Sequence, residues 1–109
     1  MNYEEQREFT RLSVELEITL YHEMWVHPIK VKSKDISLGG IFIYTSFTKD
    51  LPNSMLLSVT IPTVDERFVT FKGEVVHSVP KVGVGIRFLT KSNHLNSLIA
   101  KLRRSLPSE

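Results

Sequence analysis

Two arginines near the amino end of the chain are the first residues whose chemistry stands out. Arg7 and Arg11 are four residues apart, in the polar stretch before the first strand-like pattern. A guanidinium group is planar and always charged, and its donors match guanine O6 and N7 or the oxygens of a phosphate. It also stacks on flat rings. The pair therefore suits a flat anionic ligand, although two solvated arginines that balance nearby glutamates have the same spacing.

A second group of candidate residues lies in the segment 35–40, which reads DISLGG. Residues two apart in a strand share a face, so Asp35 and Ser37 are predicted to project together. A carboxylate accepts hydrogen bonds from N1–H and N2–H of guanine, and a hydroxyl adds a further bond. Gly39 and Gly40 are predicted to allow positive φ and the close approach of a ligand to backbone N–H groups. The alternative is an ordinary turn, which uses the same residue types.

The elements that would position these residues are short strands. Apolar and polar residues alternate, or β-branched and aromatic residues gather, in six segments: 14–20, 24–34, 41–44, 55–61, 68–78 and 82–88. Pro28 restricts the second of these strands to an edge or a bulge. Turn residues stand at 51–54 and 80–81. Strands of this length and spacing predict a small closed or nearly closed antiparallel barrel.

The remaining apolar residues predict a helix and a core. At the carboxyl end, helical spacing relates Leu95, Leu98, Ile99, Leu102 and Leu106. This pattern predicts an amphipathic helix over 92–106 that closes one mouth of the barrel. The alternating strands also contain aromatic residues that we expect in the core: Phe42, Tyr44, Phe68, Phe71 and Phe88.

We expect residues 1–109 to form one domain. Residues 1–12 are predicted to be an arm whose conformation depends on what it contacts. Residues 13–90 are predicted to be the barrel, and the helix follows. The length of 109 residues, with 41% hydrophobic and 24% charged, fits a single globular domain.

The composition also limits the compartment and the ligand. The absence of cysteine excludes disulfides and thiolate zinc sites, and fits a reducing compartment. No apolar segment approaches the roughly 18 residues of a membrane span, and the charged first residues do not match a signal peptide. We therefore expect a cytoplasmic protein without membrane insertion. A net charge of +2 suits a small anion better than a nucleic acid polymer.

Catalysis is not expected. None of the pairs among the four histidines, His22, His27, His77 and His94, has the HxxxH or HxH spacing of a metal site. The sequence contains no nucleophile elbow, phosphate-binding loop or dinucleotide fingerprint. An oligonucleotide-binding barrel would need exposed aromatic residues, which the alternation assigns to the core. A binding module is therefore the class that the residues favour.

Taken together and in this order, the two groups resemble the motifs of a known family. RxxxR followed by DxSxxG resembles the PilZ domain family, with every motif position filled: Arg7, Arg11, Asp35, Ser37 and Gly40. Segment 36–42, ISLGGIF, resembles the strand entry of that family, and segment 83–89, GVGIRFL, resembles its closing strand. The resemblance therefore extends over nearly the whole chain.

The resemblance implies a bacterial receptor for cyclic di-GMP. The implied fold is mainly β, a small six-stranded antiparallel split barrel with a C-terminal α-helix and a flexible N-terminal arm. By the same resemblance, Arg7 and Arg11 bind guanine and phosphate groups from the arm. Asp35 and Ser37 bind a guanine from the barrel, and Gly40 allows close backbone approach.

Two positions depart from the family's usual pattern. Gln6 stands where relatives often carry a further arginine, which leaves open whether one ligand or a stacked pair binds. His77 stands where relatives often have tryptophan, and it is either a base-stacking residue or an ordinary surface histidine. Gln6, Gly39 and His77 are candidates for additional ligand contacts.

The expected function is that of a receptor with no cofactor and no metal. Ligand binding is expected to order the arm and to signal through a separate, unidentified protein partner. The alternative is a PilZ-like scaffold that binds proteins and no nucleotide. We expect a monomer or a weak dimer.

Overall fold

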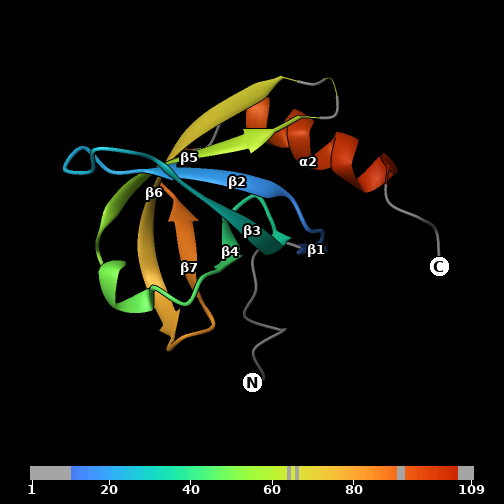
Figure 1. Ribbon diagram of the computed structural model, residues 1–109. Coiled ribbons are helices and arrows are strands. Elements are labelled where there is room, and N and C mark those ends of the chain that lie inside the picture. The colour runs from blue at the N-terminus through green and yellow to red at the C-terminus, as the bar shows by residue number, and fades with distance from the viewer. Residues whose placement is uncertain (1–10, 64, 66, 91–92, 106–109) are drawn as a thin grey trace.

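The computed structural model describes residues 11–63, 65, 67–90 and 93–105. Within them the chain is mainly β, with one 3-10 turn and one helix (Figure 1). In chain order the elements are β1 (Leu12–Ser13), β2 (Glu17–Tyr21), β3 (Ile29–Ile36), β4 (Gly40–Tyr44), η1 (Thr48–Asp50), β5 (Leu56–Pro62), β6 (Phe68–Val79), β7 (Gly83–Phe88) and α2 (Asn93–Ser105).

Six of the strands form a closed antiparallel barrel. They follow one another in the order β3-β2-β5-β6-β7-β4, and a pairing between β3 and β4 closes the ring. The short strand β1 lies outside the ring and pairs with the end of β3, where Leu12 is opposite Ile36. The predicted mainly β fold, a six-stranded antiparallel barrel with a C-terminal helix, is confirmed.

Alternation within the strands separates the core from the outer surface. The completely buried residues include Ile18 and Leu20 of β2, Ile41 and Ile43 of β4, and Val75 of β6. Because successive side chains of a strand point to opposite faces, the intervening residues of these strands face outward. This alternation decides which side chains a ligand on the outer surface of the barrel can contact.

Only two of the five aromatic residues expected in the core are buried. Phe71 and Phe88 are buried, with ring centroids 5.4 Å apart. The prediction is wrong for the other three. Phe42 is half-buried, and Tyr44 and Phe68 are 43% and 71% exposed, because they occupy outward positions of β4 and β6. The alternation in the sequence was interpreted correctly as strands, but the prediction placed these three rings on the inner face of the barrel instead of the outer one.

The first predicted strand is interrupted. Residues 14–16 lie between β1 and β2 and belong to neither strand. The buried hydroxyl of Ser33 fills the interruption, since it donates to the carbonyl oxygen of Val14 at 2.7 Å and accepts from the amide of Leu16 at 2.8 Å. Both orphaned backbone groups are thereby satisfied. β1 can therefore pair with β3. Arg11, which directly precedes β1, lies beside the barrel as a result.

The second predicted strand begins later than expected. The segment from Met24 to Pro28 is a loop, and β3 starts at Ile29. Trp25 N–H donates to the carbonyl of His22 in a tight turn, and Pro28 has no N–H to give to a ladder. β3 also runs two residues beyond the predicted end and reaches Asp35 and Ile36.

The helix packs an apolar stripe on the core. Leu95, Leu98, Ile99 and Leu102 are buried and belong to the same hydrophobic cluster as the barrel interior. In Figure 1 the helix lies alongside β2 and β5, and an ion pair between Lys101 and Asp65 ties it to the β5–β6 loop. No helix in the described part of the chain is long and apolar enough to cross a membrane.

Candidate binding site

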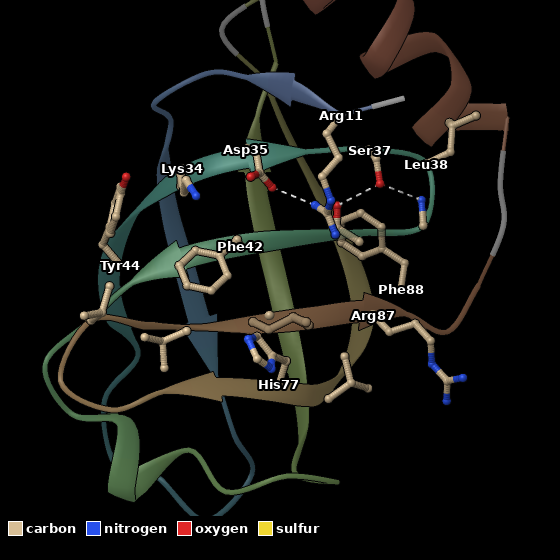
Figure 2. A pocket seen from close by; sticks show the side chains of 17 residues that line it. Arg11, Lys34, Asp35, Ser37, Leu38, Phe42, Tyr44, His77, Arg87 and Phe88 are labelled. Carbon is tan, nitrogen blue, oxygen red and sulfur yellow. Dashed lines mark hydrogen bonds and ion pairs between the residues drawn. The ribbon is translucent and has the colours of Figure 1, made fainter. Parts of the chain in front are cut away.

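An open groove of about 1050 Å³ lies on the outer surface of the barrel. It runs over β4 and β7, between the β3–β4 turn on one side and β6 on the other (Figure 2). The predicted site residues that line it are Arg11, Asp35, Ser37, Gly39, Gly40 and His77. Arg7 and Gln6 lie outside the described residues. The groove therefore brings together every described residue of the predicted site.

Arg11 and Asp35 form an ion pair at the rim of the groove. Arg11 Nη1 donates to Asp35 Oδ1 at 2.6 Å, and their side chains are 26% and 16% exposed. β1 places Arg11 beside Asp35, because Ser13 of β1 is opposite Asp35 of β3. A carboxylate has about four acceptor positions, so the contact with Arg11 leaves Asp35 able to accept more hydrogen bonds.

Ser37 closes the turn between β3 and β4. Its amide donates to the carbonyl of Gly40 at 2.8 Å, and its hydroxyl accepts from the amide of Gly39 at 3.1 Å. Only 3% of Ser37 is exposed. Ser37 lies one residue beyond the end of β3. The prediction that Asp35 and Ser37 project from the same face of one strand therefore does not hold for Ser37. Its hydroxyl serves the loop's own backbone.

At Gly40 the backbones of β4 and β7 are too close together to leave space for a side chain. It pairs with Arg87 of β7, and a Cβ on Gly40 would lie 2.3 Å from the carbonyl oxygen of Ile86. The prediction that Gly39 and Gly40 provide positive φ is wrong, since none of the five glycines, all within the described residues, has positive φ. Close packing of β4 on β7 is sufficient to explain Gly40.

Phe42 lines the groove, although we predicted it to lie in the core. Its ring lies over β7, where a Cβ at Gly83 would be 2.7 Å from Phe42 Cε1. Lys34 extends over it, with Nζ 5.6 Å from the ring centroid, and Tyr44 meets it edge-on at 6.2 Å. In Figure 2 the ring of Phe42 is seen from its open face. The alternation with buried Ile41 and Ile43 is the signal that identifies it as outward-facing.

Two irregularities in the ladders shape the sides of the groove. The β3–β4 pairing shifts register between Ser33 and Asp35, and the β6–β7 pairing shifts between Val75 and His77. Bulges of this kind redirect side chains and are frequent beside functional sites. After the shifts, a single cross-strand row runs over four strands: Asp35, Phe42, Gly85 and His77. His77 thus faces the same groove as Asp35.

A second ion pair lies at the end of the groove. Arg87 Nη2 donates to Glu74 Oε1 at 2.5 Å, and the Arg87 side chain is 60% exposed. In Figure 2 Arg87 points away from Arg11 and the turn. The described residues contain no cluster of three or more histidine or carboxylate groups that is suited to a metal ion. Within the part of the chain that the structure describes, the charged side chains that line the groove, apart from Arg87 and His77, are Arg11, Lys34 and Asp35.

These features define a small closed-barrel domain that carries a surface groove at its β3–β4 turn. The family model of the PilZ domain matches residues 5–105. The chain therefore belongs to the PilZ domain family. A comparison with curated protein sequences finds no match.

Solved structures with the same fold include three PilZ-type proteins. The Bacillus subtilis inhibitor of motility, MotI/DgrA, has a TM-score of 0.73 at 18% identity over 91% of this chain and 51% of that one. This chain thus spans about half the length of MotI. The Escherichia coli YcgR PilZ domain with cyclic di-GMP has a TM-score of 0.72 at 15% identity, covering 92% and 94%. The CeSA PilZ domain, from a cellulose-synthesizing bacterium, has a TM-score of 0.67 at 12% identity, covering 89% and 99%. At these identities the likeness concerns the fold.

Proposed function

We propose that this chain is a cytoplasmic receptor that binds cyclic di-GMP in the groove and does no chemistry on it. Asp35 accepts hydrogen bonds from the guanine edge, and Arg11 and Arg7 contact guanine or phosphate. Further contacts come from Gln6, Gly39 and His77. The bound nucleotide connects the amino-terminal segment to the barrel, and the response passes to a separate protein partner.

The observation that carries this proposal is the composition of one open face. A guanidinium and a carboxylate are paired at 2.6 Å, and the carboxylate is directly opposite Phe42 in the β3–β4 register. Guanine offers donors on its Watson–Crick edge, acceptors at O6 and N7, and a flat π face. Each of these features has a counterpart within the groove. The Lys34 ammonium near the ring adds a positive charge for a phosphate.

A protein-binding scaffold without a nucleotide is the second candidate function. It is favoured by Ser37 and Gly40, because both have structural reasons to be present. Ser37 closes its own turn, and Gly40 permits the contact of β4 with β7. A scaffold would keep these residues for folding alone. Asp35 and Arg11 have no comparable role in the barrel core, and they favour the receptor.

Isothermal titration calorimetry distinguishes the two functions. The chain is titrated with cyclic di-GMP, and with GTP and cyclic di-AMP as controls. A receptor gives saturable binding to cyclic di-GMP alone, with a stoichiometry that decides between one molecule and a stacked pair. If cyclic di-GMP gives no heat and leaves the melting temperature unchanged at high concentration, the receptor is excluded and the scaffold stands.

A further inference from the structure

The loop between β2 and β3 holds two apolar side chains in solvent. Met24 is 80% exposed and Val26 is 87% exposed, the highest values among the large apolar side chains of the described residues. Between them, Trp25 is partly buried and packs against the hydrophobic core. In Figure 1 this loop projects from the barrel on the side away from α2. We call residues 22–27 the β2–β3 tip.

The β2–β3 tip is held in one conformation by its own contacts. Trp25 N–H donates to the carbonyl oxygen of His22 at 2.9 Å, and Met24 N–H donates to His22 Nδ1 at 3.1 Å. The rings of His22 and Trp25 are neighbours, with centroids 5.8 Å apart. Because the tip is already ordered, a partner that covers Met24 and Val26 does not have to order it at an entropic cost. The tip is thus a preorganised apolar group.

A cleft that suits such a group lies in the barrel wall of the same chain. β4 ends at Tyr44, opposite Lys32, and the chain then turns toward β7, where Thr45 N–H donates to the carbonyl oxygen of Val82 at 3.0 Å. Within the described chain, residues 29–31 of β3 therefore have no strand beside them on that side. The result is a cleft of about 460 Å³, which we call the β3 cleft. Its apolar walls are Ile29, Val31, Tyr44 and Phe47.

The charges around the tip and the cleft are complementary. Glu23 is an exposed residue of the β2–β3 tip, and Lys30 and Lys32 line the β3 cleft. Lys32 is paired with Glu15 at 3.1 Å. Lys30 lies 3.9 Å from Glu17 and its side chain is 73% exposed, so it is available to a carboxylate of another molecule. One chain therefore carries both an apolar, acidic projection and an apolar, basic cleft.

We propose that two copies of this chain form a dimer in which the β2–β3 tip of each copy enters the β3 cleft of the other. A dimer with two-fold symmetry uses the same surface on both copies, so one tip and one cleft per chain give two equivalent contacts. Met24 and Val26 pack against the apolar walls, and Glu23 contacts Lys30 of the other copy. Contacts of this size belong to the class of weak interfaces, and we expect a dissociation constant of about 10–100 μM. The dimer goes beyond the proposed function, since the β3 cleft is separate from the groove and shares only Tyr44 with it.

The test is sedimentation velocity of the purified chain, without nucleotide, at concentrations up to about 1 mM. The wild type is expected to change from monomer to dimer as its concentration rises, and a chain that stays monomeric throughout would overturn the proposal. Because no nucleotide is present, the result does not depend on the proposed function.

Two variants remove the two halves of the contact. Met24→Ser combined with Val26→Ser removes the apolar tip, and Phe47→Ser removes one wall of the cleft. Each is expected to raise the dissociation constant of the dimer by about a hundredfold or more. The three side chains are between 65% and 87% exposed, so the melting temperatures should be unchanged. Phe68→Ser is the matched control, because Phe68 is 71% exposed and lines neither the groove nor the β3 cleft. A dimer that survives the tip or cleft substitutions, or that is lost with Phe68→Ser, would contradict the proposal.

A mixture of the tip variant and the cleft variant identifies the contact itself. Neither variant can pair with itself, but in a heterodimer the intact tip of the Phe47→Ser copy enters the intact cleft of the other copy. We expect the equimolar mixture to dimerise about tenfold more weakly than the wild type, and more strongly than either variant alone. A mixture that dimerises no better than its components would mean that tip does not meet cleft, and would overturn the reciprocal arrangement.

A membrane is the other surface that an exposed apolar loop can contact. The segment 15–32 contains three glutamates and two lysines, so it has no excess of positive charge for anionic lipid. We therefore expect the chain not to sediment with vesicles of anionic phospholipid. Sedimentation with vesicles that is lost in the Met24→Ser, Val26→Ser variant would assign the tip to a membrane surface and overturn the dimer.

Discussion

The two sides of the groove differ in how their residues relate to the fold. The motif side contains Asp35, Ser37 and Gly40, which are close together in sequence, and the structure gives Ser37 and Gly40 clear structural tasks. The strand side contains Phe42, His77 and Gly85, which come from three strands and form no motif. Gly85 lines the groove, and neither a positive φ nor a close contact at its Cβ position explains it. A complete motif is thus weaker evidence of ligand binding when folding alone accounts for some of its residues.

The largest effect should come from Gly40→Val. A Cβ at Gly40 would overlap the carbonyl oxygen of Ile86, and neither strand can move without breaking the β4–β7 ladder. We expect a loss of about 3 kcal/mol or more in the free energy of unfolding, measured by urea denaturation. Gly85→Ala, in the same groove, should leave the free energy of unfolding unchanged. A Gly40→Val chain with wild-type stability would remove the contrast between the two glycines.

The next largest effect should be on recognition of the base by Asp35. Asp35→Ala removes the carboxylate that accepts the guanine donors, and we expect a loss of about 1–3 kcal/mol in cyclic di-GMP binding. Adenine presents a donor and an acceptor in place of these two donors, so the preference for cyclic di-GMP over cyclic di-AMP should fall as well. Titration of both nucleotides measures the two quantities. A variant that keeps the preference would show that specificity resides on the strand side.

Arg11→Ala should weaken binding by a similar or smaller amount, and its combination with Asp35→Ala is more informative than either change alone. Because the two side chains are in contact at 2.6 Å, their effects should not add. We expect the double variant to lose less than the sum of about 1–3 kcal/mol for each single change. Arg103→Ala is the control, since Arg103 is exposed on the helix and does not line the groove. Strict additivity would mean that Arg11 and Asp35 act on separate parts of the ligand.

Much of the fold was predictable from the sequence because it depends on local periodicity. The alternation in 14–20, 68–78 and 82–88 identified strands, and the spacing from Leu95 to Leu102 identified the helix. The interruption of the first strand was not predictable, since it depends on a hydrogen-bonding partner, Ser33, that lies 17 residues from Leu16.

The site was predictable only where its residues are neighbours in the chain. Arg11 and Asp35 were identified as chemistry-bearing residues, but their pairing depends on the β1–β3 register. The cross-strand row depends on two bulges, at Lys34 and Val76, that no local pattern reveals. Phe42 was assigned to the core because period two does not specify which face is buried. Those three-dimensional relations determine which residues share the groove.

The smallest effect is expected away from both sides of the groove, at the ion pair between Lys101 of the helix and Asp65 of the β5–β6 loop. The hydrogen bond and the charge of Lys101 lower the pKa of Asp65 below its ordinary value of 3.8. A lowered pKa in the folded state stabilises the fold above the unfolded-state pKa, and this contribution is lost as the pH falls through the lowered value. Lys101→Ala should therefore raise the pKa of Asp65, as measured by NMR titration, and should lower the melting temperature slightly at neutral pH but not in strong acid.

Both groups of this ion pair are solvent-exposed, so the stability change should be small compared with that of Gly40→Val. Binding of cyclic di-GMP should be unchanged by Lys101→Ala, because neither residue lines the groove. The variant thus sets the baseline for judging the binding losses of Asp35→Ala and Arg11→Ala. A change in affinity with Lys101→Ala would show that the helix end is coupled to the groove. The effects of substitutions on the two sides of the groove would then reflect the whole barrel, and not only the residues that line the groove.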